Sequence, residues 1–320
     1  MRRIKPTALR SGGTIAVVAP ASPVTPDRIE FGLEWLKQQG YQVVSGQHLF
    51  DRRGYLAGDD RDRAADLMEM FARRDVDAIF CARGGYGTPR LLDRLDYGLI
   101  KRNPKVFLGY SDITGLHLAI QRRTGLVTFH GPMVEADPRV GFIEYNWQGV
   151  LKAVTDPRPI GGIQNPPGGP PLRVVAGGKA RGRLVGGNLS LISATLGTPY
   201  EIDTRARILF LEDVGEAPYR MDRMLNHLLL AGKLQEASGI IIGESVGCEK
   251  AAGDRPSLTL LEILEDLLAG LGKPVISGLV VGHGYYKASL PLGVEAVLDA
   301  DAGSLEVVEA ALAPGPGDLA

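Results

Sequence analysis

A serine between an apolar run and a helical pattern is the first candidate for chemistry in this sequence. Residues 106–108 have strand character, the motif Gly109-Tyr110-Ser111-Asp112 follows, and residues 113–120 show the apolar spacing of a helix. A serine at such a corner holds a strained backbone and projects its hydroxyl from the sheet, and the helix N–H groups face the same spot. We therefore predict that Ser111 is a nucleophile. The alternative is that Ser111 only caps the helix, because Ile113 replaces the second glycine of a full G-x-S-x-G motif.

A nucleophilic serine needs a base, and His283 has the best context of the five histidines. It stands between Gly282 and Gly284 at the end of an apolar run, where small neighbours leave the imidazole accessible. His130, which ends another expected strand, remains the alternative base. The other histidines are most simply structural or surface residues: His48, His117 and His227.

The base in turn needs an acidic partner that orients it. Glu212 follows an apolar strand and is the first candidate, while Glu216 lies close behind and stays open as the competitor. The backbone N–H of Asp112 is suited to stabilise an oxyanion. A second N–H could come from Gly85 in the loop Arg83-Gly84-Gly85-Tyr86-Gly87. That loop could instead cradle a phosphate, but neither common phosphate-binding motif is present.

The elements that would position these residues alternate between short apolar strands and amphipathic helices in the first half of the chain. Such alternation predicts a parallel sheet covered on both faces, with its ligand crevice at the carboxyl ends of the strands. Both the glycine-rich loop and Ser111 follow strand carboxyl ends. We expect strands over 14–19, 41–44, 77–82, 106–108 and 126–130, and helices over 27–39, 60–74, 88–95 and 147–154.

The second half follows a segment in which prolines and glycines interleave. Residues 156–171 should form an irregular linker between domain 1–155 and domain 172–320. After a glycine turn at 186–187 we expect helices from 189 and over 221–231 and 257–269, and strands over 207–213, 239–243, 274–277, 296–299 and 305–308. The expected fold is therefore α/β, with a Rossmann-like N-terminal domain joined to a smaller α+β C-terminal domain.

Composition excludes several classes of function. The 320 residues carry a net charge of -1, which offers no footprint for nucleic acid or an anionic membrane. Neither a signal core nor an apolar run of transmembrane length is visible, so we expect a cytoplasmic protein. Cys81 and Cys248 lie far apart and form no metal-ligand spacing, which fits a reducing compartment without a disulfide framework. We expect no cofactor.

Taken together, these motifs resemble the LD-carboxypeptidases of serine peptidase family S66, which include the microcin C7 immunity proteins. The resemblance covers nearly the whole chain. It rests on the motifs Arg83-Gly84-Gly85-Tyr86-Gly87, Gly109-Tyr110-Ser111-Asp112, His130-Gly131-Pro132-Met133, Gly186-Gly187-Asn188-Leu189-Ser190, Leu211-Glu212-Asp213, Tyr219-Arg220-Met221-Asp222-Arg223 and Gly282-His283.

The resemblance implies a Ser-Glu-His triad in that chain order. Ser111 matches the nucleophile, Glu212 the acid and His283 the base, with Gly85 and Asp112 as backbone oxyanion donors; Glu216 lies in the same patch and remains a rival for the acid. Candidates for substrate binding in the same motifs are Arg83, Tyr86, Asn188, Tyr219 and Arg220. The family also implies a cytoplasmic, metal-free homodimer that removes the terminal D-alanine from murein tetrapeptides.

Other functions remain open. Microcin-type members share the triad but cleave aminoacyl-nucleotide amides, using aromatic residues of an additional loop to stack the base. The two tryptophans, Trp35 and Trp147, suggest no such loop here, which favours the peptide substrate. A non-enzymatic alternative is a two-domain binding module whose crevice only holds a small ligand.

Overall fold

The computed structural model describes residues 3–249 and 256–314, which divide into two compact units. The first unit is formed by Met1–Arg158, Ser289–Gly293 and Ala310–Ala320, and the second by Pro159–Ala288 and Val294–Glu309, as far as these ranges are described. Each unit has its own sheet.

The first unit contains a six-stranded sheet in the order β12-β5-β4-β3-β1-β2. Strands β1 to β5 run parallel, and only β12 at the edge is antiparallel, with Leu290 opposite His130. The central strands are buried along their whole length, which requires cover on both faces. The strands are β1 (Thr14–Val18), β2 (Gln42–Ser45), β3 (Ala78–Cys81), β4 (Val106–Gly109), β5 (Thr128–His130) and β12 (Leu290–Leu292).

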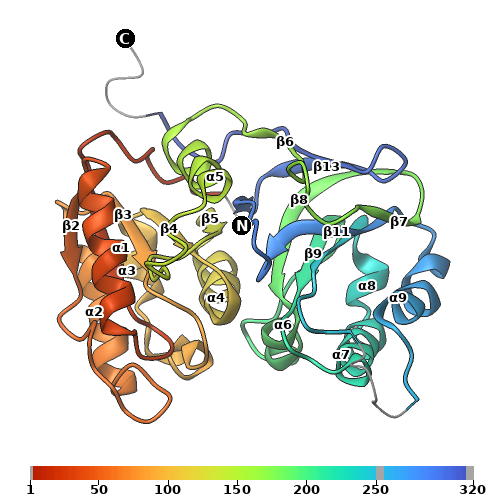
Figure 1. The fold of residues 1–320 in the computed structure, drawn as a ribbon, viewed down its shortest axis with the longest axis horizontal. Helices are drawn as coiled ribbons and strands as arrows, with labels where there is room; N and C mark the ends of the chain where they lie inside the picture. The colour runs from red at the N-terminus through yellow and green to blue at the C-terminus, as the bar shows by residue number, and fades with distance from the viewer. Residues whose placement is uncertain (1–2, 250–255, 315–320) are drawn as a thin grey trace. The chain divides into compact units, whose positions relative to one another are not determined.

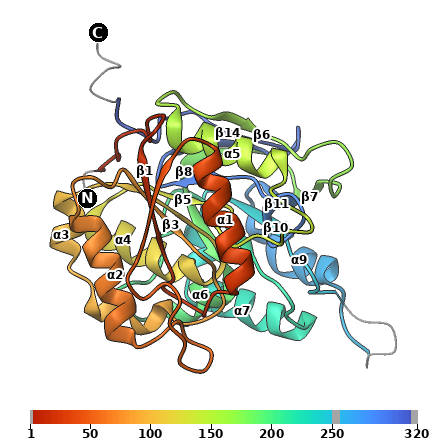
Figure 2. The same cartoon turned by 60° about the vertical axis from the view of Figure 1, so that its left-hand side comes forward.

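Helices provide that cover. Helix α1 lies on one side of the strands, and α2, α3 and α4 lie on the other (Figure 2). Trp35 of α1 meets Trp147 of α5 edge to face, with ring centroids 4.4 Å apart, and stacks on Phe142. The predicted parallel sheet with helices on both faces is therefore confirmed. The helices are α1 (Pro26–Gln38), α2 (Asp60–Ala72), α3 (Tyr97–Arg102), α4 (Thr114–Thr124) and α5 (Glu144–Thr155).

One predicted helix of this unit is wrong. Residues 88–95 form two short 3-10 turns, Thr88–Arg90 and Leu92–Arg94, and the helix α3 comes after them. The carboxylate of Asp96 explains its position, because it accepts a hydrogen bond from Leu99 N and so caps a new helix.

The second unit contains an eight-stranded mixed sheet in the order β6-β14-β13-β8-β9-β10-β11-β7. Strands β8 to β11 are parallel, and the flanking strands pair antiparallel. The strands are β6 (Gly161–Ile163), β7 (Arg173–Ala176), β8 (Lys179–Asn188), β9 (Arg207–Glu212), β10 (Gly239–Glu244), β11 (Val275–Gly282), β13 (Glu295–Asp299) and β14 (Ser304–Val307). The molecule is thus of the α/β class, as predicted.

Helix α6 contacts β8 and α9 contacts β7, and α7 lies between α6 and α9 (Figure 1). Helix α9 begins one turn later than predicted, because Thr259 and Glu262 form a reciprocal capping box at its start. The helices are α6 (Leu189–Thr195), α7 (Pro218–Leu230), α8 (Lys233–Glu236) and α9 (Leu260–Leu268).

Strands account for the main differences from the sequence expectation in this unit. The segment 156–171, expected to be wholly irregular, contains the edge strand β6. Gly186 and Gly187 belong to the end of β8 rather than to a turn. A Cβ on Gly186 would lie 1.9 Å from Phe210 O, so this glycine permits close pairing with β9.

Among the described residues, no helix combines the length and the apolar character needed to cross a membrane.

Candidate active site

The corner at Ser111 has the strained geometry expected of a nucleophile elbow. β4 ends at Gly109, and a single 3-10 turn from Ser111 to Ile113 leads directly into α4. Ser111 has a φ of 65°, in the left-handed region that L-residues other than glycine rarely adopt. The residue before the turn, in the cap position, is Tyr110, so the alternative that Ser111 is the N-cap is wrong.

Gly109 leaves space for this corner. A Cβ at Gly109 would lie 2.9 Å from Ile113 Cγ2, closer than real side chains approach, and 3.1 Å from Cys81 Cβ. Glycine therefore lets the chain turn from strand to helix here without displacing either neighbour.

The glycine-rich loop after β3 is packed against the same corner. A Cβ on Gly84 would lie 2.9 Å from Ser111 Cβ and 3.0 Å from its Oγ. Thr88 N donates to Asp112 Oδ2 at 2.8 Å, and the Thr88 hydroxyl donates to Asp112 O. Burial raises the pKa of the Asp112 carboxyl, and the donors at Thr88 and Gly87 partly oppose that rise. The predicted donors Gly85 and Asp112 therefore belong to segments that contact each other.

Two substrate-binding candidates lie on this loop. Arg83 donates to Pro23 O at 3.3 Å and lies 3.6 Å from a carboxylate oxygen of Glu135, so its guanidinium already has acceptors. Tyr86 is about half exposed, and its ring meets that of Tyr55 edge to face at 5.7 Å.

In the second unit, the predicted acid and base lie side by side. His283 Nδ1 and Glu212 Oε2 are joined by a hydrogen bond of 2.7 Å. Glu212 is the last residue of β9, where its side chain is fully buried, whereas the His283 side chain is 15% exposed just after β11. A buried carboxylate bonded to Nδ1 fixes the ring orientation and leaves Nε2 as the nitrogen for proton transfer.

Two glycines leave the space that the Glu212 side chain occupies. A Cβ on Gly282 would lie 2.4 Å from Glu212 Oε2, and one on Gly243 would lie 3.0 Å from Glu212 Cβ. In this enclosed position, burial raises the pKa of Glu212, while the hydrogen bond to His283 acts in the opposite direction. The hydrogen bond to His283 is the largest of the interactions that favour the ionised carboxylate over the neutral acid.

Asp213 was not singled out from the sequence, yet it organises the turn after the acid. Its carboxylate accepts hydrogen bonds from Asn188 Nδ2 at 3.0 Å and from both N and Oγ of Ser190. Asn188 lies opposite Glu212 in the β8–β9 ladder and caps α6. Its hydrogen bond to Glu212 opposes the rise in the pKa of Glu212 that burial causes. The sequence signals for Asp213 were its position next to Glu212 and its place in the motif Leu211-Glu212-Asp213.

The remaining candidates of this unit form a separate surface group at the start of α7. Glu216 lies 3.4 Å from Arg220 Nη1, and Arg220 Nε donates to the hydroxyl of Tyr219, which is 60% exposed. Glu216 is therefore engaged by an arginine, and it is Glu212 that contacts His283.

The other histidines occupy different surroundings. His117 is fully buried, bonds Gly109 O through Nε2 at 2.9 Å, and burial lowers its pKa to about 4. His130 is buried in β5 with its ring edge-to-face against Tyr110. His227 lies 3.0 Å from Ser193 Oγ on the surface. A neutral, bonded His117 is unsuited to proton transfer.

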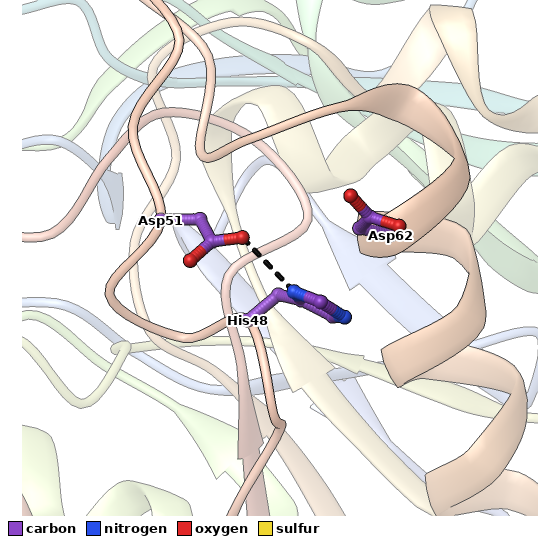
Figure 3. Close-up of side chains that lie close together, drawn as sticks. All are labelled: His48, Asp51 and Asp62. Atoms are coloured by element: carbon purple, nitrogen blue, oxygen red, sulfur yellow. Dashed lines mark hydrogen bonds and ion pairs between the residues drawn. The ribbon is translucent and has the colours of Figure 1, made fainter.

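His48, Asp51 and Asp62 form the one group of possible metal ligands that the described residues bring together. Their ligand atoms lie within 4.8 Å of one another, and His48 Nδ1 bonds Asp51 Oδ2 at 2.9 Å (Figure 3). This bond raises the pKa of His48 and so favours the protonated imidazole, which cannot ligate a metal. We assign no metal to this group.

The chain matches one family in both halves. Residues 15–131 match the LD-carboxypeptidase N-terminal domain, and residues 181–298 match the LD-carboxypeptidase C-terminal domain. A probable murein peptide carboxypeptidase of Bacillus subtilis (strain 168) is 43% identical over 311 residues, covering 97% of this chain and 96% of that protein.

Solved structures of related proteins are similar to this chain over nearly its whole length. The muramoyltetrapeptide carboxypeptidase from Oxalobacter formigenes is similar with a TM-score of 0.80 and 30% identity, over 92% of this chain and 97% of that one. The microcin C7 self-immunity protein MccF, solved with glutamyl sulfamoyl guanosine, gives a TM-score of 0.88 and 27% identity, over 97% and 99%.

Proposed function

The chain belongs to the LD-carboxypeptidase family and is a carboxypeptidase, and from this premise we propose that it removes the terminal D-alanine from peptidoglycan-derived tetrapeptides through a Ser-Glu-His triad. The observation that carries the proposal is the hydrogen bond between His283 Nδ1 and the buried carboxylate of Glu212. Such a pair has the chemistry of a general base with its orienting acid.

In the proposed mechanism, Ser111 Oγ attacks the carbonyl carbon that precedes D-alanine while His283 Nε2 takes the hydroxyl proton. The tetrahedral oxyanion receives hydrogen bonds from Gly85 N–H and Asp112 N–H. The carbon–nitrogen bond then breaks, His283 protonates the leaving amine, and D-alanine departs. Water attacks the acyl-enzyme with His283 again as base, which releases the shortened peptide and restores Ser111.

The similarity to MccF supports a second candidate substrate, an aminoacyl-nucleotide amide, for the same triad. Aromatic stacking of a nucleobase would need an accessible aromatic side chain. Both tryptophans pack within one cluster with Phe142, so neither is available for such stacking, although Tyr86 and Tyr219 are exposed. The greater identity to a murein peptide carboxypeptidase than to MccF, 43% against 27%, favours the peptide over the nucleotide.

The first test measures D-alanine release from L-Ala-γ-D-Glu-meso-diaminopimelate-D-Ala by mass spectrometry. We expect the wild type to release D-alanine and Ser111→Ala to lose roughly 10⁶-fold in turnover with substrate binding retained. Normal turnover by Ser111→Ala would refute the nucleophile. Release only from an aminoacyl-nucleotide amide would replace the peptide substrate by the second candidate.

A matched pair of variants tests the acid. Glu212→Gln should lower kcat on the order of 10³ to 10⁴-fold, because the amide no longer stabilises the protonated imidazole. Glu216→Gln removes only a surface ion pair with Arg220 and should stay within about threefold. The reverse ranking would assign the acid to Glu216.

We also propose that the enzyme is a cytoplasmic homodimer. Its net charge of -1 supports the further proposal that it binds neither nucleic acid nor anionic membranes. Light scattering of the purified protein measures its mass in solution, and a monomer would contradict the dimer.

A further inference from the structure

A buried guanidinium lies beneath the glycine-rich loop of the first unit. Arg63 of α2 is 1% exposed, although a lone buried charge is costly. Its Nη2 donates to the carboxylate of Asp60, and Nη1 donates to two backbone carbonyls, Pro20 O and, at 3.1 Å, Gly87 O. The guanidinium of Arg63 therefore joins the loop after β1 and the glycine-rich loop after β3 to helix α2.

The two loops that Arg63 joins are also hydrogen-bonded to each other. Ser22 N donates to Gly84 O at 3.2 Å, and Ser22 Oγ accepts from Tyr86 N at 3.1 Å. Gly85 lies so close to Ser22 that an added Cβ would be 2.3 Å from its Oγ. The backbone around Gly85 is thus enclosed by the loop after β1.

The opposite side of the glycine-rich loop meets the nucleophile corner. Thr88 is bonded twice to Asp112, and Gly84 packs on Ser111. The position of Gly85 N–H relative to Ser111 therefore depends on both attachments, one at Asp112 and one at Arg63.

We propose that Arg63, paired with Asp60, is a positioning residue that holds the Gly84–Gly87 loop where Gly85 N–H can donate to the oxyanion formed at Ser111. The inference rests on the proposed serine mechanism. Arg63 contacts loop backbone and Asp60 and acts through the loop, so its loss should lower the rate of the chemical step more than the affinity for substrate.

Arg63→Met tests this role, because Arg90 continues to pair with Asp60 at 2.9 Å and limits the loss of folding stability. Lys105→Met is a matched control. Lys105 is also a buried cation bonded to backbone carbonyls, those of Arg73 and Val76. It lies at the amino-terminal end of β4, whereas Ser111 follows the carboxyl end of that strand. Thermal unfolding of both variants measures their stability.

Two activities are measured for each variant: kcat and KM for the tetrapeptide, and the rate constant for labelling of Ser111 by a fluorophosphonate. We expect Arg63→Met to lose about 10 to 100-fold in kcat and in labelling rate, with KM within about threefold. Lys105→Met should keep kcat and the labelling rate within about threefold of the wild type, although its melting temperature should fall about as much as that of Arg63→Met. Arg63→Lys, which keeps the charge but not the fork, should be intermediate and serves in place of Arg63→Met if that variant does not fold.

Equal rates in Arg63→Met and Lys105→Met would overturn the positioning role, as would a rise in KM without a fall in kcat. If the wild type labels at Ser111 but releases no D-alanine, the peptide substrate is wrong while the labelling rates still decide the role of Arg63. Absence of labelling in the wild type would overturn both proposals.

Discussion

Two buried titratable side chains support the corner at Ser111, and burial moves their pKa values in opposite directions. The pKa of Asp112 is raised, whereas that of His117 is lowered to about 4. Both side chains bond backbone groups of the corner and its neighbouring loop. Burial in each case favours the neutral form over the charged one.

His117 makes the stability of the protein depend on pH. Its pKa is about 4 in the folded protein and about 6.5 when unfolded, so the unfolded chain binds the extra proton between these values. The contribution of His117 is therefore present above the unfolded pKa and is lost as the pH falls toward 4. The difference amounts to roughly 3 kcal/mol.

Urea unfolding at several pH values between 4 and 7 measures this effect. We expect the free energy of unfolding of the wild type to fall more steeply with acid than that of His117→Gln, which keeps an N–H donor but does not titrate. Identical slopes for the two proteins would show that His117 does not carry the dependence.

At the residue scale, the sequence could nominate the acid but could not choose between its two candidates. Glu212 and Glu216 both follow the same apolar run, and only the extent of β9 decides which one is enclosed by the sheet. Arg63 could not be recognised either, because nothing in its local sequence distinguishes a buried arginine from a solvated one.

At the element scale, the packing between β9, β10 and β11 determines whether the side chain of Glu212, the proposed acid, fits between the strands. Gly282 has a φ of 118°. Although β10 lies between β9 and β11, the Glu212 side chain reaches β11 so closely that a Cβ on Gly282 would lie 2.4 Å from Glu212 Oε2. The end of β11 therefore needs glycine for both conformation and space.

Gly282→Ala should consequently displace the acid. We expect a loss of about 2 kcal/mol in unfolding free energy and about 10²-fold in kcat, measured by urea unfolding and D-alanine release. Gly270→Ala is the control, since a Cβ at that position meets nothing within 4 Å, and it should be neutral. Full activity of Gly282→Ala would mean that the acid tolerates this shift.

Strands in the interior of the first sheet were predictable because they are continuous apolar runs between helices. The strand β8 was not, since its sequence, KARGRLVGGN, is rich in arginine and glycine and gains its pairing from neighbours on both sides. β6 could not be predicted from its own sequence either. Its three residues pair with β14 at the sheet edge, but they belong to a segment whose prolines and glycines indicate a loop.

At the scale of the whole molecule, the first unit is not one continuous stretch of chain. Its sheet receives β12 from residues 290–292, and Ala313 pairs with Thr7 near the amino terminus. Ala313 N also donates to Pro6 O at 2.8 Å. Local sequence patterns cannot reveal such returns, because each involves partners more than 150 positions apart.

A chain truncated after Arg158 should therefore fold poorly, because β5 would lose its edge partner and residues 6–8 their pairing. We expect no cooperative unfolding transition for this fragment in urea, whereas the full chain should show one. A cooperative transition in the fragment would mean that the returning segments contribute little.

The late arrival of β12 also sets an order of events on the ribosome. The 135 residues from Pro159 to Gly293 must be synthesised after the first 158 before the sheet of the first unit can be completed. At about 5 to 20 residues per second, this interval lasts roughly 7 to 27 s. During that time the nascent chain carries β5 with an unpaired edge, so this enzyme has a reason to depend on holdase chaperones while it is being translated.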